Sequence, residues 1–172
     1  LRGIPENKDI WCMNTAWLLT GSNMGMREDY LSAAKREIGL QCGTVQKESS
    51  IYETAAWGKT DQPAFLNQAL EIITPLNARQ LIRRLLKIDK QLGRIREEKY
   101  GPRLIDIDIL MYGDEIHQYD LLKLPHPELP NRRFALLPLA EIAADVIHPV
   151  LQQSIYRLLA ICPDPLEVKK LS

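Results

Sequence analysis

Apolar and polar positions alternate most regularly between residues 104 and 111. A period of two is typical of a β-strand, in which successive side chains point to opposite faces of the sheet. Asp106 and Asp108 would therefore lie together on one face of this strand. The other face would be apolar and would carry Ile105, Ile107, Ile109 and Met111.

Strand and helix patterns interleave along the rest of the chain. Apolar runs predict three further extended segments, which cover residues 16–20, 43–54 and 65–73. Apolar residues three and four positions apart predict helices over residues 27–38, 77–92 and 155–161. A further apolar helix is expected after the proline-rich segment that ends at Phe134, and it should end near residue 146. We expect the first two helices to end at Gly39 and Gly93, and Asn77 to cap the start of the second.

This order predicts one α+β domain. We expect an antiparallel sheet covered by helices on one face, because the strands and helices alternate without repeats or a linker. The order strand, helix, strand, strand, helix, strand resembles a ferredoxin-like arrangement. Met13 is a plausible initiator just before the first strand, so we expect a domain over residues 13–172 and an extension, residues 1–12, outside the fold.

Composition narrows the class of protein. Lys and Arg together number 22 and equal Asp and Glu, so the chain has no net basic field of the kind that attracts nucleic acid. Cys12, Cys42 and Cys162 are odd in number and lack metal-ligand spacing, which indicates reduced thiols in a cytoplasmic protein. No apolar run has the length, about 18 residues or more, of a membrane span. We expect a monomer, with a dimer as the alternative.

The carboxylates of Asp106 and Asp108 are the strongest candidates for chemistry. Two acids on one strand face repel each other unless a cation or hydrogen-bond donors compensate, and Mg²⁺ is commonly held by one or two carboxylates together with substrate phosphates. Basic residues suited to polyphosphate precede the strand, namely Arg94, Arg96, Lys99 and Arg103. The alternative is an edge strand whose charged outer face serves solubility.

Other candidates each have a structural alternative. The turn from Gly21 to Gly25 could cradle a phosphate or could be a plain turn, since it lacks the Walker ending. Trp57 could cover a small hydrophobic ligand or fill the edge of the core. Phe65 and Asn67 could stack on and hydrogen-bond a planar heterocycle, or could be ordinary sheet residues. His126, between two prolines, could hold a ligand or be structural.

The motifs together resemble the 6-hydroxymethyl-7,8-dihydropterin pyrophosphokinase family over nearly everything from Thr15 to about Pro163. The resemblance rests on Gly21-Ser22-Asn23, Tyr52-Glu53-Thr54, Asp61-Gln62-Pro63, Leu66-Asn67, Gly93-Arg94-Ile95-Arg96, the run from Gly101 to Ile109, Pro125-His126, Asn131-Arg132 and Phe134. It implies an enzyme of folate biosynthesis, a transferase that moves pyrophosphate from ATP to the pterin alcohol and releases AMP.

The resemblance also implies roles for individual residues. Asp106 and Asp108 would bind two Mg²⁺ ions that bridge the ATP phosphates. The catalytic set would be Asp106 and Asp108 with three basic residues, Arg94, Arg96 and Arg103. ATP would be bound by Asp89, Arg94, Arg103, His126 and Arg132. The pterin would be bound by Thr54, Ala56, Trp57, Phe65, Asn67 and Phe134, with the two phenylalanines on either side of its ring.

Two other functions remain as alternatives. A glycine-serine turn combined with an Asp-x-Asp strand is also found in metal-dependent nucleotidyltransferases, although Ser22 and Asp106 are far apart in sequence for that class. A non-catalytic ferredoxin-like module could instead retain a pterin or nucleotide pocket. The products formed from ATP distinguish the three functions.

Overall fold

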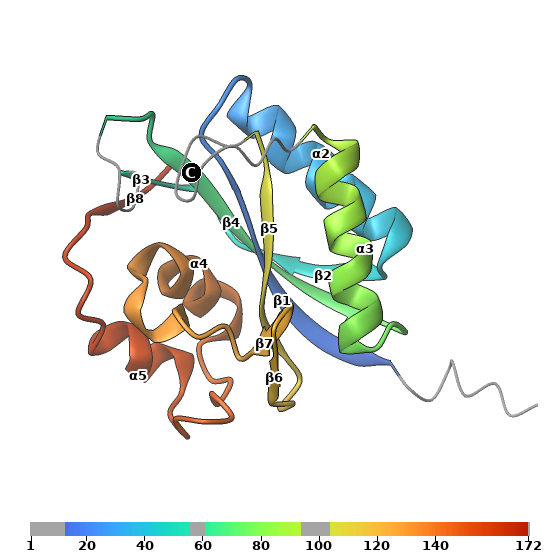
Figure 1. Ribbon diagram of the computed structural model, residues 1–172. Coiled ribbons are helices and arrows are strands. Elements are labelled where there is room, and N and C mark those ends of the chain that lie inside the picture. Colours follow the sequence, from blue (N-terminus) through green and yellow to red (C-terminus); the bar gives the residue numbers. More distant parts are fainter. Residues whose placement is uncertain (1–12, 56–60, 94–103, 172) are drawn as a thin grey trace, which may run out of the picture.

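The computed structural model describes residues 13–55, 61–93 and 104–171. Within these residues the centre of the molecule is a six-stranded antiparallel sheet with strand order β5-β1-β4-β3-β8, in which β2 also pairs with β4 (Figure 1). The strands of this sheet are β1 (Asn14–Ser22), β2 (Thr44–Glu48), β3 (Tyr52–Thr54), β4 (Phe65–Thr74), β5 (Asp106–Tyr112) and β8 (Val168–Lys170).

The helices connect and cover these strands. They are α2 (Arg27–Gln41), α3 (Ala78–Gln91), α4 (Arg133–Ala143) and α5 (Ile155–Ala160), with a short 3-10 turn η1 (Leu129–Asn131). A separate hairpin is formed by β6 (His117–Tyr119) and β7 (Leu122–Leu124). The order β1, α2, β2 with β3, β4, α3, β5 and the position of β1 and β4 at the centre of the sheet confirm the ferredoxin-like α+β fold.

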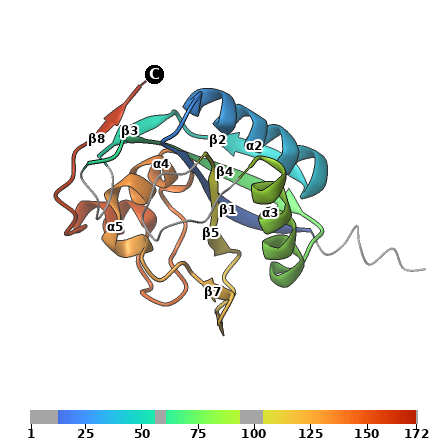
Figure 2. The same ribbon diagram turned by 45° about the horizontal axis from the view of Figure 1, so that its top comes forward.

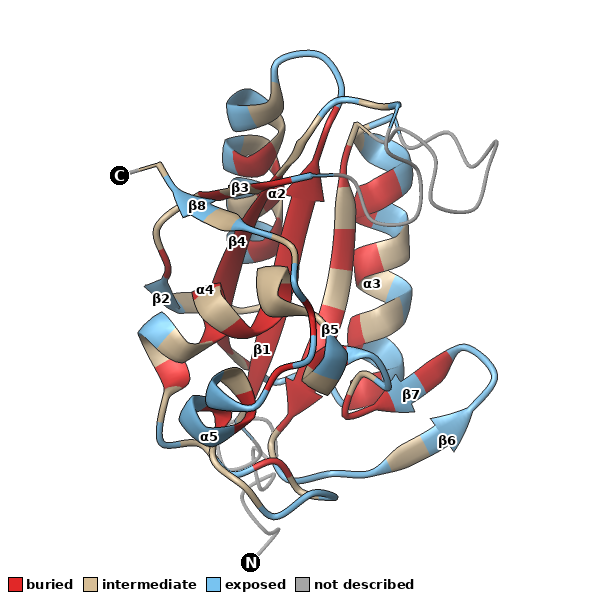
Figure 3. Ribbon diagram, turned by 90° about the vertical axis from the view of Figure 1, so that its left-hand side faces the viewer, coloured by how far each residue is buried: buried red, intermediate tan, exposed pale blue. Residues whose placement is uncertain are grey.

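Helices cover both faces of the sheet. Figures 1 and 2 show α2 and α3 against one face and α4 and α5 against the other. Leu18 belongs to the apolar cluster under α2 and α3, whereas Trp17 and Leu19 belong to the cluster under α4 and α5. The prediction that helices cover only one face was therefore wrong. The central strands are buried on both sides, as Figure 3 shows for β1 and β4, so neither strand presents a face to solvent.

An irregularity in β5 alters the alternation that its sequence predicts. Trp17 pairs with Met111 and Leu18 pairs with Ile109, so Leu110 is an extra residue in β5. Leu110 and Met111 both pack under α4, while Ile109 packs on the opposite face. The prediction that Met111 shares a face with the isoleucines was wrong, because a bulge of one residue reverses the alternation beyond it.

The ends of the two long helices have different causes. α3 begins at a capping box in which Asn77 Oδ1 accepts from the Gln80 N–H and Gln80 Oε1 accepts from the Asn77 N–H, and Gly93 follows its end with φ +89°, as predicted. The expected stop at Gly39 was wrong, since α2 passes through this exposed glycine. The turn comes at Gly43, where a Cβ would lie 2.1 Å from the Ile73 carbonyl oxygen.

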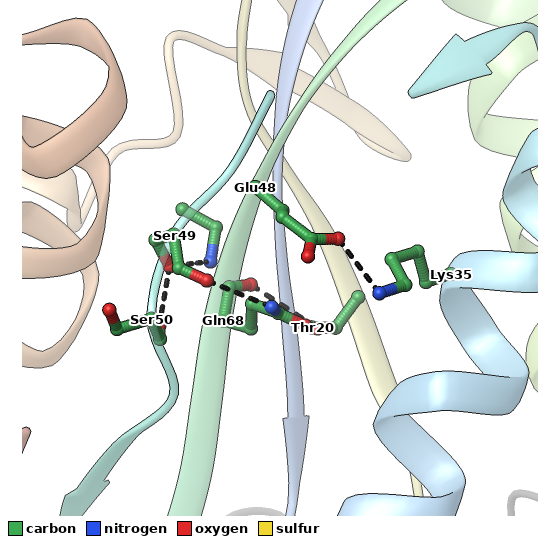
Figure 4. A network of polar contacts seen from close by, with 7 residues as sticks. Thr20, Lys35, Glu48, Ser49, Ser50 and Gln68 are labelled. Carbon is green, nitrogen blue, oxygen red and sulfur yellow. Dashed lines mark hydrogen bonds and ion pairs between the residues drawn. The ribbon is translucent and has the colours of Figure 1, made fainter. Parts of the chain in front are cut away.

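The extended segment predicted for residues 43–54 is divided into β2 and β3, which both pair with β4. Between them, Ser49 exchanges hydrogen bonds with the Ala69 backbone, and Gln68 Nε2 donates to the Ser49 carbonyl at 2.9 Å (Figure 4). Side-chain bonds thus hold the chain against β4 where the strand is interrupted.

In the part of the chain described here, no helix has the length and apolar composition needed to cross a bilayer.

Candidate active site

The two carboxylates lie at the start of β5, on the sheet face that α4 covers. Asp106 pairs with Gly21 and Asp108 with Leu19, and residues in direct antiparallel register project to the same face. Leu19 belongs to the cluster under α4, which fixes that face. Both aspartates are only partly buried. The pair predicted from the alternation therefore has access to solvent at the end of an otherwise apolar strand.

A glycine separates these carboxylates from the next polar group in the sheet. Gly21 pairs with Asp106 on one side and with Asn67 on the other. A Cβ at position 21 would lie 2.7 Å from Asn67 Oδ1, closer than real Cβ contacts allow. The absence of a side chain on Gly21 thus lets the buried Asn67 amide lie over β1, on the same sheet face as Asp106.

Residues of β3 and β4 extend this row of polar groups. Tyr52 pairs with Asn67, and Thr54 pairs with Phe65, so all four project to the face that carries the two aspartates. Thr54 is buried, and its Oγ1 donates to the Glu167 carbonyl oxygen at 3.0 Å. Aspartates, amide, threonine and aromatic ring therefore occupy neighbouring positions across four strands.

His126 lies beside β5, in the segment before η1, and the charge of Asp106 acts on its ring. Its backbone N–H donates to the Leu110 carbonyl oxygen at 2.9 Å. Burial, together with the positive charge of Arg132, lowers the pKa of His126 to about 4, against the opposing charges of Glu128 and Asp106. The imidazole is neutral at pH 7, and because Nδ1 accepts from the Glu128 N–H at 3.1 Å, its proton lies on Nε2.

Arg132 and Phe134 flank the first residue of α4. The Arg132 guanidinium carbon lies 5.7 Å from the centre of the Phe134 ring. Arg132 Nε is buried and has no hydrogen-bond partner among the residues that the structure describes. A buried N–H without an acceptor is costly, and an anionic ligand would supply one. The start of α4 thus combines a cation suited to phosphate with an aromatic ring.

A family model described as 7,8-dihydro-6-hydroxymethylpterin-pyrophosphokinase (HPPK) matches residues 17–144 of the chain. The chain belongs to the HPPK family. It is 44% identical over 140 residues to the 2-amino-4-hydroxy-6-hydroxymethyldihydropteridine pyrophosphokinase of Aquifex aeolicus, which covers 80% of this chain and 86% of that protein. It is 45% identical over 134 residues to the Bacillus subtilis protein of the same name, covering 77% and 80%.

Solved HPPK-DHPS chains share the fold. The structure of a Plasmodium falciparum HPPK-DHPS triple mutant with pteroate has a TM-score of 0.69 and 16% identity to this HPPK chain, covering 86% of this chain and 43% of that one. The A437G/K540E variant with pterin and p-hydroxybenzoate gives the same TM-score, identity and coverage. This chain thus spans less than half the length of the solved chains that it matches, and at this identity they support the fold alone.

Several residues predicted for the HPPK site are not tested by the structure. Asp89 is buried near the end of α3, on the opposite face of the sheet from α4, and its predicted contact with ATP stays a prediction. The remaining members of the predicted site lie outside the described residues; they are Ala56, Trp57, Arg94, Arg96 and Arg103.

The structure adds supporting residues that the sequence did not single out. Asn23 Nδ2 donates to Gln62 Oε1 and to the Pro63 carbonyl oxygen, at 2.9 and 3.0 Å, and so fixes the segment before Phe65. Asn23 and Gln62 belong to the motifs that carry the HPPK resemblance, and this is the signal that could have revealed them. Glu141 accepts a hydrogen bond from the Tyr52 hydroxyl, and Asp164 accepts one from the Arg133 N–H. No signal in the sequence singled out either residue, because these contacts join positions far apart in the chain.

Proposed function

We propose that Asp106 and Asp108 are the metal-binding acids with which this member of the HPPK family transfers pyrophosphate from ATP to 6-hydroxymethyl-7,8-dihydropterin and releases AMP. The main support is the register that joins Asp106, Gly21 and Asn67 across β5, β1 and β4. This row brings carboxylates suited to a metal and its polyphosphate next to an amide suited to a heterocycle. Neither group alone would specify this reaction.

The carboxylates fit Mg²⁺. Both are partly exposed oxygen donors on one strand face, and Mg²⁺ prefers a few carboxylates with water and phosphate oxygens completing its shell. The described residues contain no group of three or more candidate ligands, which suits a site completed by a substrate. We propose two Mg²⁺ ions, which would supply neutralisation of the polyphosphate charge when bound.

The nucleotide side of the site consists of Arg132 and His126. Arg132 Nε would donate to a phosphate oxygen, and the neutral His126 ring would donate through Nε2. Arg94, Arg96 and Arg103 would complete the phosphate contacts and stabilise the charge that develops during transfer. Asp89 would lie near the nucleotide.

The pterin side consists of Phe65, Asn67, Phe134 and Thr54. The rings of Phe65 and Phe134 would lie on opposite faces of the heterocycle, and the Asn67 amide would read its hydrogen-bonding edge together with the backbone near Thr54. Ala56 and Trp57 would close this pocket. The hydroxymethyl oxygen would then be directed at the β-phosphorus of ATP, so that positioning and charge neutralisation account for most of the rate.

The remaining expectations are part of the same proposal. The enzyme acts on small molecules, and the equal numbers of basic and acidic residues argue against a nucleic-acid partner. We propose that it is a monomer, with a dimer as the alternative. We also propose that it works in the cytoplasm, because the buried Cys42 and Cys162 are free thiols.

The test is AMP release from ATP and Mg²⁺, measured with and without the dihydropterin. We expect release only with the pterin, and a fall of about 100-fold or more in kcat/KM for Asp106→Asn and Asp108→Asn. Asp114→Asn, in the exposed turn after β5, is the matched control and should keep full activity.

Two results would contradict the proposal. Transfer of a nucleoside monophosphate to the acceptor would indicate a nucleotidyltransferase. Binding of ATP and pterin without any AMP would indicate a binding module.

A further inference from the structure

We propose that Asp164 is a positioning residue for the pterin, acting through the start of α4 and through the C-terminal segment, residues 162–170. This inference rests on the proposed function, because it concerns the geometry of the same substrate site. Asp164 is not part of the motifs that carry the family resemblance and lies outside the matched residues 17–144. The residue is 2% exposed, so the charge of its carboxylate must be compensated within the protein.

Both oxygens of the Asp164 carboxylate accept backbone hydrogen bonds. Oδ2 accepts from the Arg133 N–H and Oδ1 from the Leu166 N–H, each at 3.0 Å. Arg133 in turn donates from Nε to the Asp164 carbonyl oxygen and from Nη2 to that of Cys162, each at 3.2 Å. The buried carboxylate and the first residue of α4 are thus joined by contacts in both directions.

The carboxylate takes the place of a helix cap. Arg132 is the N-cap residue of α4 and makes no side-chain capping bond, whereas helix starts normally need an acceptor for their first N–H groups. Asp164 supplies that acceptor from 31 residues away and adds a negative charge at the positive end of the helix dipole. The direction in which α4 begins therefore depends on the C-terminal segment.

The same segment is attached to the opposite side of the pterin site. Two residues beyond Leu166, β8 pairs with β3, and Val168 is the register partner of Thr54. The Glu167 carbonyl oxygen accepts from Thr54 Oγ1. Residues 162–170 thus join the helix end that carries Phe134 to the strand that carries Thr54, as the close approach of β8 and β3 in Figure 1 shows.

The consequence concerns the distance between the two aromatic rings of the site. Phe134 follows Arg133 directly, so a shift of the first turn of α4 moves its ring relative to Phe65 on β4. Two rings that enclose a planar ligand tolerate little displacement, and an error of about 1 Å in a bound geometry can cost roughly 100-fold in rate. Asp164 would set this spacing without touching the substrate.

A cap that serves stability alone is the competing explanation, and the experiment separates the two. Dissociation constants of the dihydropterin are measured by calorimetry with Mg²⁺ and an ATP analogue whose α–β bridging oxygen is replaced by methylene. AMP release gives KM for each substrate and kcat. The variants are Asp164→Asn and Asp164→Ala, with Arg133→Gln as a milder change that keeps the Asp164 cap but removes the two guanidinium bonds.

Two control variants reproduce the other effects of these substitutions, namely lower stability and the loss of a charge. Thr74→Val removes a buried hydroxyl that donates to the Cys42 carbonyl oxygen at the far end of β4, and so it lowers stability away from the site. Asp145→Asn removes an exposed charge just beyond the other end of α4. Both should bind pterin as the unaltered protein does.

We expect the Asp164 variants to weaken pterin binding and raise its KM by about tenfold. Affinity for the ATP analogue should fall by a clearly smaller factor because, although Arg132 precedes Arg133, the carboxylates of β5 stay in place. Arg133→Gln should shift pterin binding in the same direction by a smaller factor, and it decides the question should the Asp164 variants not fold. Equal losses of affinity for pterin and nucleotide, or unchanged pterin binding, would overturn the inference. AMP release by the unaltered protein would at the same time uphold the proposed function. An unaltered protein that neither binds pterin nor yields AMP would overturn both.

Discussion

Gly21 on β1 and Asp106 on β5 are direct partners in the antiparallel register of the sheet. The glycine contributes no side chain beside the carboxylate, and its other partner, Asn67, is buried with its amide oxygen only 2.7 Å from where a Cβ of residue 21 would be. The smallest residue thus lies between the metal side and the pterin side of the proposed site. Its size, more than its backbone freedom, explains its position.

Replacement of Gly21 should weaken pterin binding and leave the free energy of unfolding nearly unchanged. In Gly21→Ala the new methyl group, 2.7 Å from Asn67 Oδ1, forces the amide to rotate. We expect KM for the dihydropterin to rise about tenfold, since a misplaced hydrogen-bonding group loses most of its contribution. Alanine gains about 0.5–1 kcal/mol over glycine within a strand, which offsets the local strain in the free energy of unfolding.

Gly39→Ala is the matched control for this change. Nothing lies within 4 Å of a Cβ at position 39, inside α2, so the substitution should raise the free energy of unfolding by about 0.5–1 kcal/mol and leave KM unchanged. Steady-state kinetics and urea unfolding of both variants check the prediction. A Gly21→Ala enzyme with unaltered pterin kinetics would contradict it.

His126 should make the stability of the fold sensitive to moderate acid. Its pKa is lowered from 6.5 to about 4 in the folded protein by burial and by Arg132. Between these values the unfolded chain binds a proton that the folded chain does not, so the free energy of unfolding falls as the pH decreases from 6.5 to 4. The loss of unfolding free energy caused by protonation of His126 is at most about 3 kcal/mol.

The pH prediction is checked by urea unfolding of the unaltered protein and of His126→Gln at pH 7, 5.5 and 4.5. The variant should lose less stability over this range. A residual slope will remain, because burial also lowers the pKa of His148. Identical slopes for the two proteins would show that His126 does not titrate as described.

Arg132→Lys should weaken nucleotide binding more than it alters stability. Lysine lacks the buried Nε and the planar group that lies over Phe134, and it offers a phosphate a single point of contact. We expect KM for ATP to rise about tenfold. Arg157→Lys, on the exposed side of α5, should leave KM unchanged. Equal KM values for the two variants would remove Arg132 from the nucleotide site.

Tyr52 should contribute to the position of α4 through its hydroxyl group. It donates to Glu141 Oε2 at 2.5 Å, and Glu141 Oε1 also accepts from the N–H and Oγ of Ser50. Burial, then the hydrogen bond and charge of Glu141, raise the pKa of Tyr52 to about 12, so it stays a donor at all physiological pH values. Tyr52→Phe should lower the free energy of unfolding by about 1 kcal/mol.

Tyr112→Phe removes an equivalent hydroxyl, which donates to the Leu76 carbonyl oxygen at 2.7 Å on the other face of the sheet. Both variants should lower the melting temperature by about 2–4 °C. Only Tyr52→Phe should also raise KM for the pterin, because Tyr52 is the register partner of Asn67. The same kinetic change in both variants would indicate a general loss of rigidity.

Local patterns accounted for most elements of the fold. The alternation around Asp106 and Asp108 located β5, and the apolar spacing with Asn77 and Gly93 bounded α3, because these signals depend only on neighbouring residues. The patterns failed where a distant contact decides the structure. The stop of α2 depends on a close approach of Gly43 to Ile73, and the break after β2 depends on bonds between Ser49 and Ala69.

The sequence by itself predicted the carboxylate pair on one strand face and, through its resemblance to the family, the reaction class, since motifs and period are properties of residues close together in the chain. Only the tertiary structure decided that helices cover both faces of the sheet and that Gly21 separates Asp106 from Asn67. It also decided that Asp164 caps α4. Strand register and helix docking are fixed by contacts between segments distant in the chain, and the free energy of those contacts exists only once the whole domain has folded.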